Sequence, residues 1–329
     1  AEMLRAGVTA VADHYFHMER AFAAYEKAGM RANLAWAVFG VGEDAEENLE
    51  RALRFSEDCS GRSRRISVSL GPHSPYLCPD PFLERVTAES DRLGLPMHIH
   101  VSEEPGQVER SLPERGKTPV QVLEETGVLR EGTILAHAYY ADDEDLRRIV
   151  RAGAGVAHCA KTYMKFADIH DFLPRALDAG VTIGLGTDGA ASNGRLSLFE
   201  TARDAALLAK AAAGNPELGR TEELIPLLSG GGEVIGLPNY GNIEEGAPAD
   251  LLLIDPESPN MQPETNVWAN LLYSLSERDI ETVIVDGRVV VRGGELAGVD
   301  FAELFEASRE AAERIIRRDD GTPMQRYES

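Results

Sequence analysis

Histidine and carboxylate side chains recur where short apolar segments of this sequence end. Residues 97–103 read Met-His-Ile-His-Val-Ser-Glu. On an extended strand His98 and His100 would share one face, because side chains alternate, and Glu103 follows where the strand ends. Imidazole is a common metal ligand, and a nearby carboxylate can act as general acid or base. The segment therefore predicts a metal ligand beside a proton-transfer group. The alternative, a solvated helix N-terminus, suits Glu104 better than Glu103.

Three further segments place polar residues at similar positions. His137 and His158 end apolar runs, and His73 lies just beyond another. Asp188 ends a glycine-bearing apolar run, where an isolated carboxylate would be costly to bury without a metal or a charged histidine. Asp188 as the N-cap of a helix from Ser197 is a weaker alternative, because that helix begins too late. Any single histidine could be a core residue, but the recurrence favours a shared site.

These residues need elements that bring them together, and the sequence alternates strand and helix patterns. Parallel strands joined by helices place all their carboxyl ends at one rim, where barrel enzymes build their sites. Seven strands are predicted, one short of the eight that close such a barrel. They span residues 8–12, 32–39, 66–70, 97–101, 133–137, 155–158 and 181–186.

The pattern changes after about residue 214. Residues 246–255 and 280–291 are predicted to form β-strands, the second broken by the turn Asp286-Gly287. Residues 301–318 form the pattern of an amphipathic helix. We therefore expect a barrel domain over residues 1–237, a β-annex over 238–299, and a C-terminal helix and tail over 300–329.

Composition excludes several classes of function. The 329 residues include 33 Lys and Arg against 55 Asp and Glu, a net charge of −22. No basic surface is available for nucleic acid or an anionic membrane. No run of about 20 apolar residues could span a membrane. Cys59, Cys78 and Cys159 are too few and too scattered for a disulfide framework, so a cytoplasmic location is expected.

The joint pattern of motifs resembles the amidohydrolase superfamily. Within it, the chain is most similar to the metal-dependent deaminases of S-adenosylhomocysteine and methylthioadenosine, and to the s-triazine chlorohydrolases. The order and spacing match from about residue 2 to residue 296. The matching motifs are residues 71–78 (GPHSPYLC), 100–103 (HVSE), 136–137 (AH), 186–193 (GTDGAASN) and 243–250 (IEEGAPAD).

The resemblance implies roles for individual residues. His100 and Asp188 correspond to metal ligands, His137 to a histidine that touches the metal or its water, and Glu103 to the proton shuttle. The implied cofactor is one divalent metal, with zinc first and iron second. The implied reaction is hydrolytic deamination: activated water attacks the amine-bearing ring carbon, Asp188 takes the proton of the water, and Glu103 protonates a ring nitrogen. The residues expected to contact the substrate are His73, Ser192, His158 and Trp36.

Three departures from the family pattern refine these expectations. The expected fold is α/β, a (β/α)8 TIM-type barrel with a partial β-sandwich. The His-x-His pair of the first barrel strand is absent, so we expect the barrel to lack its first strand in this chain and the chain to bind metal weakly. Residues 36–45 hold no arginine where the deaminases bind a nucleoside with an amino-acid tail. The seventh-strand motif is replaced by His-Cys-Ala-Lys-Thr-Tyr-Met-Lys over 158–165.

The sequence therefore leaves three functions open. The first is a deaminase of an amino-substituted heterocycle such as a purine, pterin or triazine. The second is a triazine chlorohydrolase, and the third is an inactive or ligand-binding relative. We expect a small-molecule substrate without a free α-carboxylate, unless Arg31, Lys161 or Lys165 reaches the site. Association with copies of itself is left open.

Overall fold

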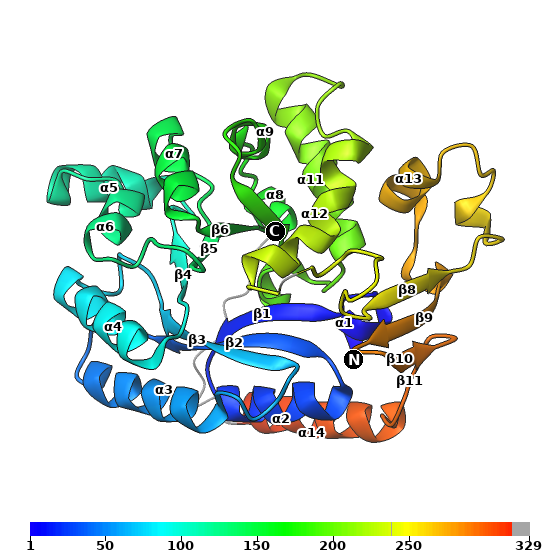
Figure 1. Ribbon diagram of the computed structural model, residues 1–329, viewed down its shortest axis with the longest axis horizontal. Helices are drawn as coiled ribbons and strands as arrows, with labels where there is room; N and C mark the ends of the chain where they lie inside the picture. Colours follow the sequence, from blue (N-terminus) through cyan, green and yellow to red (C-terminus); the bar gives the residue numbers. More distant parts are fainter. Residues whose placement is uncertain (238, 318–329) are drawn as a thin grey trace.

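The computed structural model describes residues 1–237 and 239–317 and has a strongly curved parallel sheet at its centre (Figure 1). All seven predicted strands are present and pair in parallel. β1–β2–β3 and β4–β5–β6–β7 form two sheets, which a parallel bridge between Leu70 and Met97 joins. The strands are β1 (Ala10–Tyr15), β2 (Arg31–Val38), β3 (Ile66–Pro72), β4 (His98–Val101), β5 (Ile134–His137), β6 (Gly155–His158) and β7 (Thr182–Leu185).

The sheet is open between its first and last strands. Among residues 1–237 and 239–317, no strand pairs with β1 on the side away from β2 or with β7 on the side away from β6. The expected count of seven parallel strands is therefore confirmed. That the barrel is of the eight-stranded type and lacks its first strand in this chain stays a prediction.

Helices alternate with these strands and cover the outside of the sheet (Figure 1). Their local signals agree with the sequence. Asp142 caps α7 by accepting a hydrogen bond from the backbone N–H of Asp145, and Gly153 ends it with φ +68°. The helices are α1 (Glu2–Arg5), α2 (Met18–Ala28), α3 (Ala45–Cys59), α4 (Asp80–Leu93), α5 (Pro105–Arg115), α6 (Pro119–Glu125), α7 (Asp143–Ala152), α8 (Ala160–Lys165), α9 (Phe172–Asp178), α10 (Ala190–Asn193), α11 (Leu198–Ala213) and α12 (Thr221–Val234).

Strand β2 shows how side-chain alternation divides the molecule. Leu34 and Trp36 belong to the hydrophobic core, where the Trp36 ring lies 5.7 Å from the ring of Phe55 on α3. Asn33, which alternates with them, instead hydrogen-bonds Ser67 and Ser69 of β3. One face of the sheet therefore packs against helices, while the other carries polar groups into the barrel interior.

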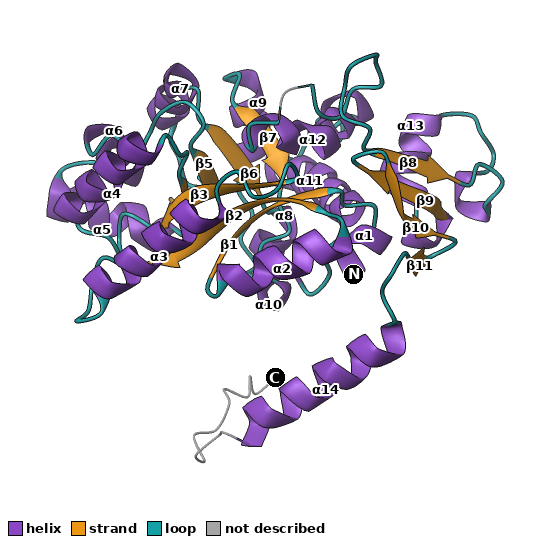
Figure 2. Cartoon of the chain, turned by 60° about the horizontal axis from the view of Figure 1, so that its bottom comes forward, coloured by secondary structure: helices purple, strands orange, loops and turns teal. Residues whose placement is uncertain are grey.

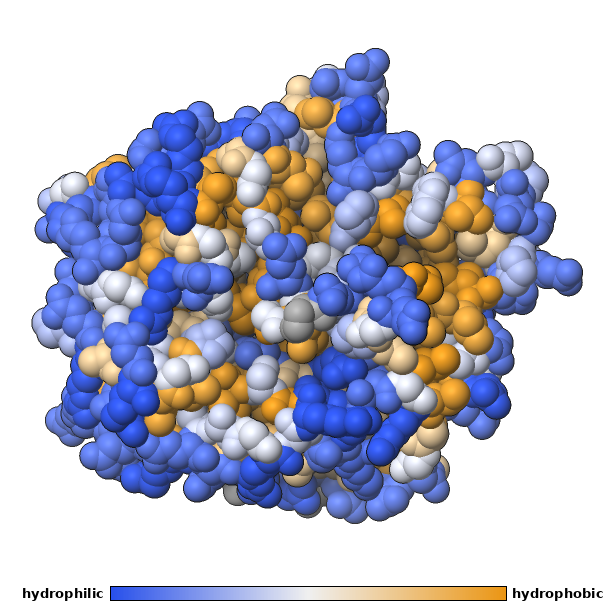
Figure 3. Space-filling view, in the orientation of Figure 1, coloured by the Kyte–Doolittle hydropathy of each residue, from blue (hydrophilic) through white to orange (hydrophobic). Residues whose placement is uncertain are grey.

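The predicted annex is a four-stranded antiparallel sheet in the order β11–β10–β9–β8. Its strands are β8 (Leu251–Ile254), β9 (Ile280–Val285), β10 (Arg288–Arg292) and β11 (Glu295–Leu296). The turn at Asp286-Gly287 is confirmed, with positive φ at both residues. A second sheet facing this one is not found in the described ranges, so a sandwich stays a prediction. Figure 3 shows apolar side chains gathered over β8 and the short helix α13 (Val267–Ala269).

The N-terminal end of the described chain lies at the annex. Helix α1 contacts β9, β10 and β11, and Leu4 is fully buried in the annex core. The predicted boundary near residue 237 stays a prediction. Helix α1, which lies at the N-terminal end of the chain, packs against the annex. Helix α14 (Phe301–Arg317) extends away from the body of the molecule (Figure 2). The expected tail over 318–329 lies outside the described residues. In the described ranges, no helix combines the length and apolarity needed to cross a membrane.

Candidate active site

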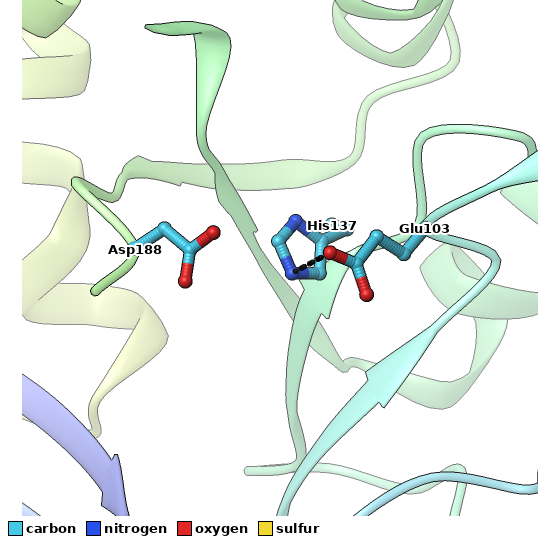
Figure 4. A group of neighbouring side chains, drawn as sticks. All are labelled: Glu103, His137 and Asp188. Atoms are coloured by element: carbon cyan, nitrogen blue, oxygen red, sulfur yellow. Dashed lines mark ion pairs between the residues drawn. The ribbon is translucent and has the colours of Figure 1, made fainter. Parts of the chain in front are cut away.

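Glu103, His137 and Asp188 converge at the carboxyl ends of three strands. Glu103 follows β4, His137 ends β5 and Asp188 follows β7, and both carboxylates point toward the imidazole (Figure 4). Glu103 Oε1 lies 3.5 Å from His137 Nε2. In the described part of the chain, these three form the one set of three His, Cys, Asp or Glu residues whose ligand atoms all lie within 4.8 Å of one another. Residues separated by 85 positions thus share one small volume.

His100 lies beside this set rather than within it. Its ring is 5.6 Å from the His137 ring and 4.7 Å from the His73 ring. His100 Nδ1 lies 3.1 Å from the backbone oxygen of His73. Because a carbonyl only accepts, Nδ1 carries the proton and Nε2 keeps a free lone pair. Metal-binding histidines are commonly oriented in this way by a hydrogen bond to the other ring nitrogen.

The backbone is strained where these side chains are presented. Ser102, His137 and Asp188 have φ of +48°, +74° and +56°, values that residues other than glycine rarely adopt. Each such residue costs on the order of 1–3 kcal/mol and persists only where surrounding contacts hold it. The strain is concentrated at the ends of β4, β5 and β7, as expected for a functional site.

Helix α8 supports the site from one side. The Tyr163 hydroxyl accepts a hydrogen bond from the backbone N–H of Cys159 at 3.2 Å and lies 3.3 Å from His137 Nδ1. Thr162 Oγ1 donates to Asp188 Oδ2 at 3.1 Å. Two successive residues of one short helix therefore orient two members of the set.

Burial sets the charge state of the site. Desolvation, together with the charges of Asp188 and Glu104, raises the pKa of Glu103 to about 7. A carboxyl group with that pKa can both hold and release a proton near neutrality. Desolvation lowers the pKa of His137 well below its usual value and lowers those of His98 and His158 to about 3. The imidazoles are therefore neutral and can act as metal ligands.

His14 is a site histidine that the sequence reasoning missed. It lies near the end of β1, with its ring 4.9 Å from the rings of both His98 and His100. Its Nε2 lies 3.1 Å from the backbone oxygen of Gly71. The strand was predicted to end at residue 12, so His14 did not appear to lie at the end of a strand as the other histidines did.

The remaining predicted residues lie at different distances from the set. His73 is at the rim, with its ring 4.8 Å from that of Phe39. His158 is 1% exposed and packs against Phe172, with both ring nitrogens lacking a hydrogen-bond partner. Ser192 is half-buried on α10.

Of two expectations about individual side chains, one differs from the structure and one agrees with it. Trp36 was expected to contact substrate, but it packs in the core under α3 because it lies on the helix-facing side of β2. Glu104 was expected at a helix N-terminus, and it takes the N-cap position of α5, without a side-chain capping hydrogen bond. Glu103 is not part of that helix terminus, and its backbone N–H is bound by Gln107 Oε1.

The three cations considered for a substrate carboxylate have other partners. Lys161 forms an ion pair with Glu200. Lys165 Nζ donates to the backbone oxygen of Ala191 at 3.1 Å. Arg31 is bound by Asp250 and Asp286 at the annex. None of the three cations is directed at the set formed by Glu103, His137 and Asp188.

The donor set fits a divalent transition metal. His137, Glu103 and Asp188 offer nitrogen and carboxylate oxygen atoms within the spacing that a single ion requires, and His100 offers an oriented nitrogen beside them. Zinc and iron both accept such mixed ligands. The close set includes Glu103, which the sequence assigned to proton transfer, and leaves His100, an expected ligand, at its side.

Comparison with known proteins shows the family of this chain. Residues 1–290 match the model of the amidohydrolase family, and the chain belongs to that family. The 5-methylthioadenosine/S-adenosylhomocysteine deaminase of Desulforudis audaxviator is 39% identical over 318 residues, which cover 96% of this chain and 74% of the relative. The 5'-deoxyadenosine deaminase of Methanopyrus kandleri is 36% identical over 317 residues, covering 95% and 74%.

Solved structures support the same class. An adenosine deaminase from Xanthomonas campestris with bound zinc superposes with a TM-score of 0.90 at 28% identity, covering 96% of this chain and 73% of that one. The atrazine chlorohydrolase of Arthrobacter aurescens, complexed with zinc, gives 0.86 at 23% identity over 93% and 73%, which shows the fold alone. The expectations of an amidohydrolase fold and of a hydrolytic deaminase are therefore confirmed.

Proposed function

We propose that this chain removes the 6-amino group of an adenine nucleoside by metal-dependent hydrolysis. The observation that carries the proposal is the convergence of Glu103, His137 and Asp188 at one rim of the barrel. The names of the curated relatives supply the substrate class, because they give 5-methylthioadenosine, S-adenosylhomocysteine and 5'-deoxyadenosine as substrates of those proteins. A purine is thereby favoured over the pterin and triazine rings that the sequence left open.

His100, His137 and Asp188 are the proposed metal ligands, and zinc is the proposed ion. The support is the free Nε2 of His100, the neutral state of His137 and the nearby carboxylate of Asp188. Bound there, a divalent ion lowers the pKa of water towards neutrality and so supplies a nucleophile.

Proton transfer falls to the two carboxylates. Asp188, held by Thr162, accepts the proton of the attacking water. Glu103 carries a proton near neutral pH and donates it to a ring nitrogen, which draws electrons from the amine-bearing carbon. His73 is proposed to contact the substrate, with Ser192 at the rim, whereas His158 is buried against Phe172. The phenol of Tyr163 holds His137 in place.

Two alternatives are weaker. Chlorohydrolase activity has support from the fold alone, because the triazine hydrolase structures are only 22–23% identical. An inactive relative is the outcome if this polypeptide holds no metal. Elemental analysis after dialysis separates that outcome from a deaminase, and His98→Ala tests whether His98 helps to retain the ion. The proposed location remains the cytoplasm, consistent with three free, buried cysteines.

Ammonia release from adenosine, 5'-deoxyadenosine and methylthioadenosine by the zinc-loaded protein tests the proposal. Glu103→Gln should lower kcat by about 10²–10⁴-fold while zinc content is unchanged, because it removes a proton-transfer group. Glu109→Gln is the matched control on the exposed surface of α5 and should keep full activity. Loss of zinc in Glu103→Gln would make Glu103 a ligand instead. Full activity of that variant would contradict the proposed role.

A further inference from the structure

A cavity of about 350 Å³ opens directly beside Glu103. Its walls include Glu103 and Glu104 at the start of α5, Tyr140 after β5, and Phe166 and Asp168 after α8. Thr162, which holds Asp188, also lines it. The cavity is therefore lined by Glu103 itself and by Thr162, the hydrogen-bond partner of Asp188. A molecule that reacts at Glu103 would extend into it.

The outer wall of this cavity is held in one arrangement. Tyr140 Oη donates to the two carboxylate oxygens of Asp168, at 2.6 and 2.7 Å. Ala167 has a φ of +58°, which a residue other than glycine adopts at an energetic cost. The backbone N–H of Asp168 donates to the backbone oxygen of Tyr163 at 2.9 Å. The carboxylate of Asp168 is therefore positioned by a side chain, by the local backbone and by α8.

The chemistry of the wall is acidic and aromatic. Three carboxyl groups line it, from Glu103, Glu104 and Asp168, and its lining residues include no lysine or arginine. Phe166 is 68% exposed at the same wall, a large ring left in contact with solvent. Carboxylates accept hydrogen bonds from hydroxyl and ammonium groups and repel another carboxylate. An exposed aromatic ring offers a stacking surface to a flat or apolar group.

We infer that this cavity receives the part of the substrate that does not react, and that it selects a neutral or cationic substituent carrying hydrogen-bond donors over one carrying a carboxylate. The inference rests on the proposed function and adds a residue that determines specificity, Asp168. It agrees with the engagement of Lys161 and Lys165 by Glu200 and Ala191, which leaves neither lysine directed at this wall.

Four adenine nucleosides that differ only at the 5' position test the inference. They are 5'-deoxyadenosine, 5'-amino-5'-deoxyadenosine, adenosine-5'-carboxylate and S-adenosylhomocysteine, assayed with the zinc-loaded full chain. The kcat/KM of each carboxylate-bearing nucleoside should be at least about 10-fold below that of the neutral and cationic ones. Equal values within about 3-fold would overturn the inference while leaving the proposed function intact.

The substitution Asp168→Asn tests whether this wall causes the discrimination against carboxylate-bearing nucleosides. It keeps a hydrogen-bond acceptor for Tyr140 but removes the charge, so it should reduce the penalty against the carboxylates by about 5-fold or more. Asp171→Asn is the matched control. Asp171 is exposed near Arg175 and His170 and does not line the cavity, and its substitution changes the net charge by the same amount. Equal effects of the two variants would assign the preference to overall charge and overturn the role of Asp168.

Measurements of binding test the inference even if the protein deaminates none of the four nucleosides. Calorimetry with Glu103→Gln should give the same order of Kd for the four nucleosides. Failure of the wild type to deaminate any of them would contradict the proposed function, whereas a reversed order of Kd would contradict the inference. Tight binding of S-adenosylhomocysteine that is lost in Lys165→Met would show that Lys165 reaches the cavity, and would also overturn it.

Discussion

The phenol of Tyr163 lies between the backbone of Cys159 and the ring of His137. Its oxygen accepts a hydrogen bond from the Cys159 N–H and has a second lone pair, which accepts the Nδ1–H of His137. This bond holds the proton of His137 on Nδ1 and leaves the lone pair of Nε2, the nitrogen that lies 3.5 Å from Glu103, free for a metal ion. A single residue of α8 thus selects which nitrogen of His137 takes part in the site.

Tyr163→Phe should therefore lower activity or zinc affinity by about 10–100-fold, the usual cost of removing a group that orients a metal-site histidine. The nitrogen chemical shifts of His137 should show mixed tautomers in the variant. Tyr139→Phe is the control, because Tyr139 stacks on Tyr163 at 3.8 Å but bonds the segment around His170. It should reduce thermal stability without changing zinc affinity. Equal zinc loss in both variants would mean that packing, not the hydrogen bond, supports His137.

At the scale of elements, α12 packs on β7 more closely than side chains would permit. A Cβ at Gly184 would lie 2.6 Å from the Cα of Gly231, whereas a Cβ at Gly231 would meet nothing within 4 Å. The glycine run 230–232 thus has a structural reason: it lets the helix approach the strand that leads to Asp188.

Substitution of these two glycines should have opposite effects. Gly184→Ala should destabilise the protein by about 1–3 kcal/mol through overpacking, and should lower activity because β7 positions Asp188. Gly231→Ala should be neutral or slightly stabilising, since alanine favours the helix by roughly 0.5–1 kcal/mol. Denaturant titration measures both. A similar loss in the two variants would contradict the close contact as its cause.

The contact between α6 and α7 carries a buried carboxyl group that does not pair with a cation. Asp145 is 2% exposed and accepts a hydrogen bond from Thr118, which caps α6. Burial raises the pKa of Asp145 from 3.8 to about 6. The folded state therefore binds this proton more tightly than the unfolded state, so stability is lost as the pH rises from 3.8 to about 6, and the full cost is present above pH 6.

Asp145→Asn should raise Tm by a few degrees at pH 8, because it removes the buried charge and keeps an acceptor for Thr118. The difference from the wild type should shrink as the pH falls from 6 and become small by pH 4, because the carboxyl is then increasingly protonated in the unfolded state as well. Calorimetric scans at pH 4, 6 and 8 measure it. A difference in Tm that does not change with pH would show that the charge of Asp145 is not responsible.

For the whole molecule, Arg31 connects the barrel to the annex. It begins β2, and its guanidinium binds Asp250, which precedes β8, and Asp286, in the turn between β9 and β10. The Arg31 and Asp250 side chains are 8% and 2% exposed. Loss of one partner of a buried ion pair leaves an uncompensated charge, which is costly.

Arg31→Met should therefore reduce the free energy of unfolding by about 3–5 kcal/mol. Arg64→Met is the matched control, because Arg64 also pairs with Asp286 but is 68% exposed. It should cost about 0–1 kcal/mol, as surface ion pairs do. Comparable losses in the two variants would mean that the interface does not depend on burial of the Arg31 pair. Restoration of part of the stability by Asp250→Asn in the Arg31→Met background would support it.

The sequence alone was enough to identify the elements and the rim. Hydrophobic periodicity is a local property, so the seven strands, the annex hairpin and the helix caps could be found from neighbouring residues. Parallel βα units place strand ends on one side, so the positions of His100, Glu103, His137 and Asp188 at a common rim followed from topology.

Tertiary structure decided which of those rim residues meet. Periodicity assigns a side chain to a face but does not set the distance between elements far apart in the chain, which depends on packing. Packing brought Glu103, His137 and Asp188 within 4.8 Å and left His100 at their side. It also brought His14 among the histidines and placed Trp36 under α3. The partners of Arg31, 219 and 255 positions away, were likewise determined only when the barrel and annex came together.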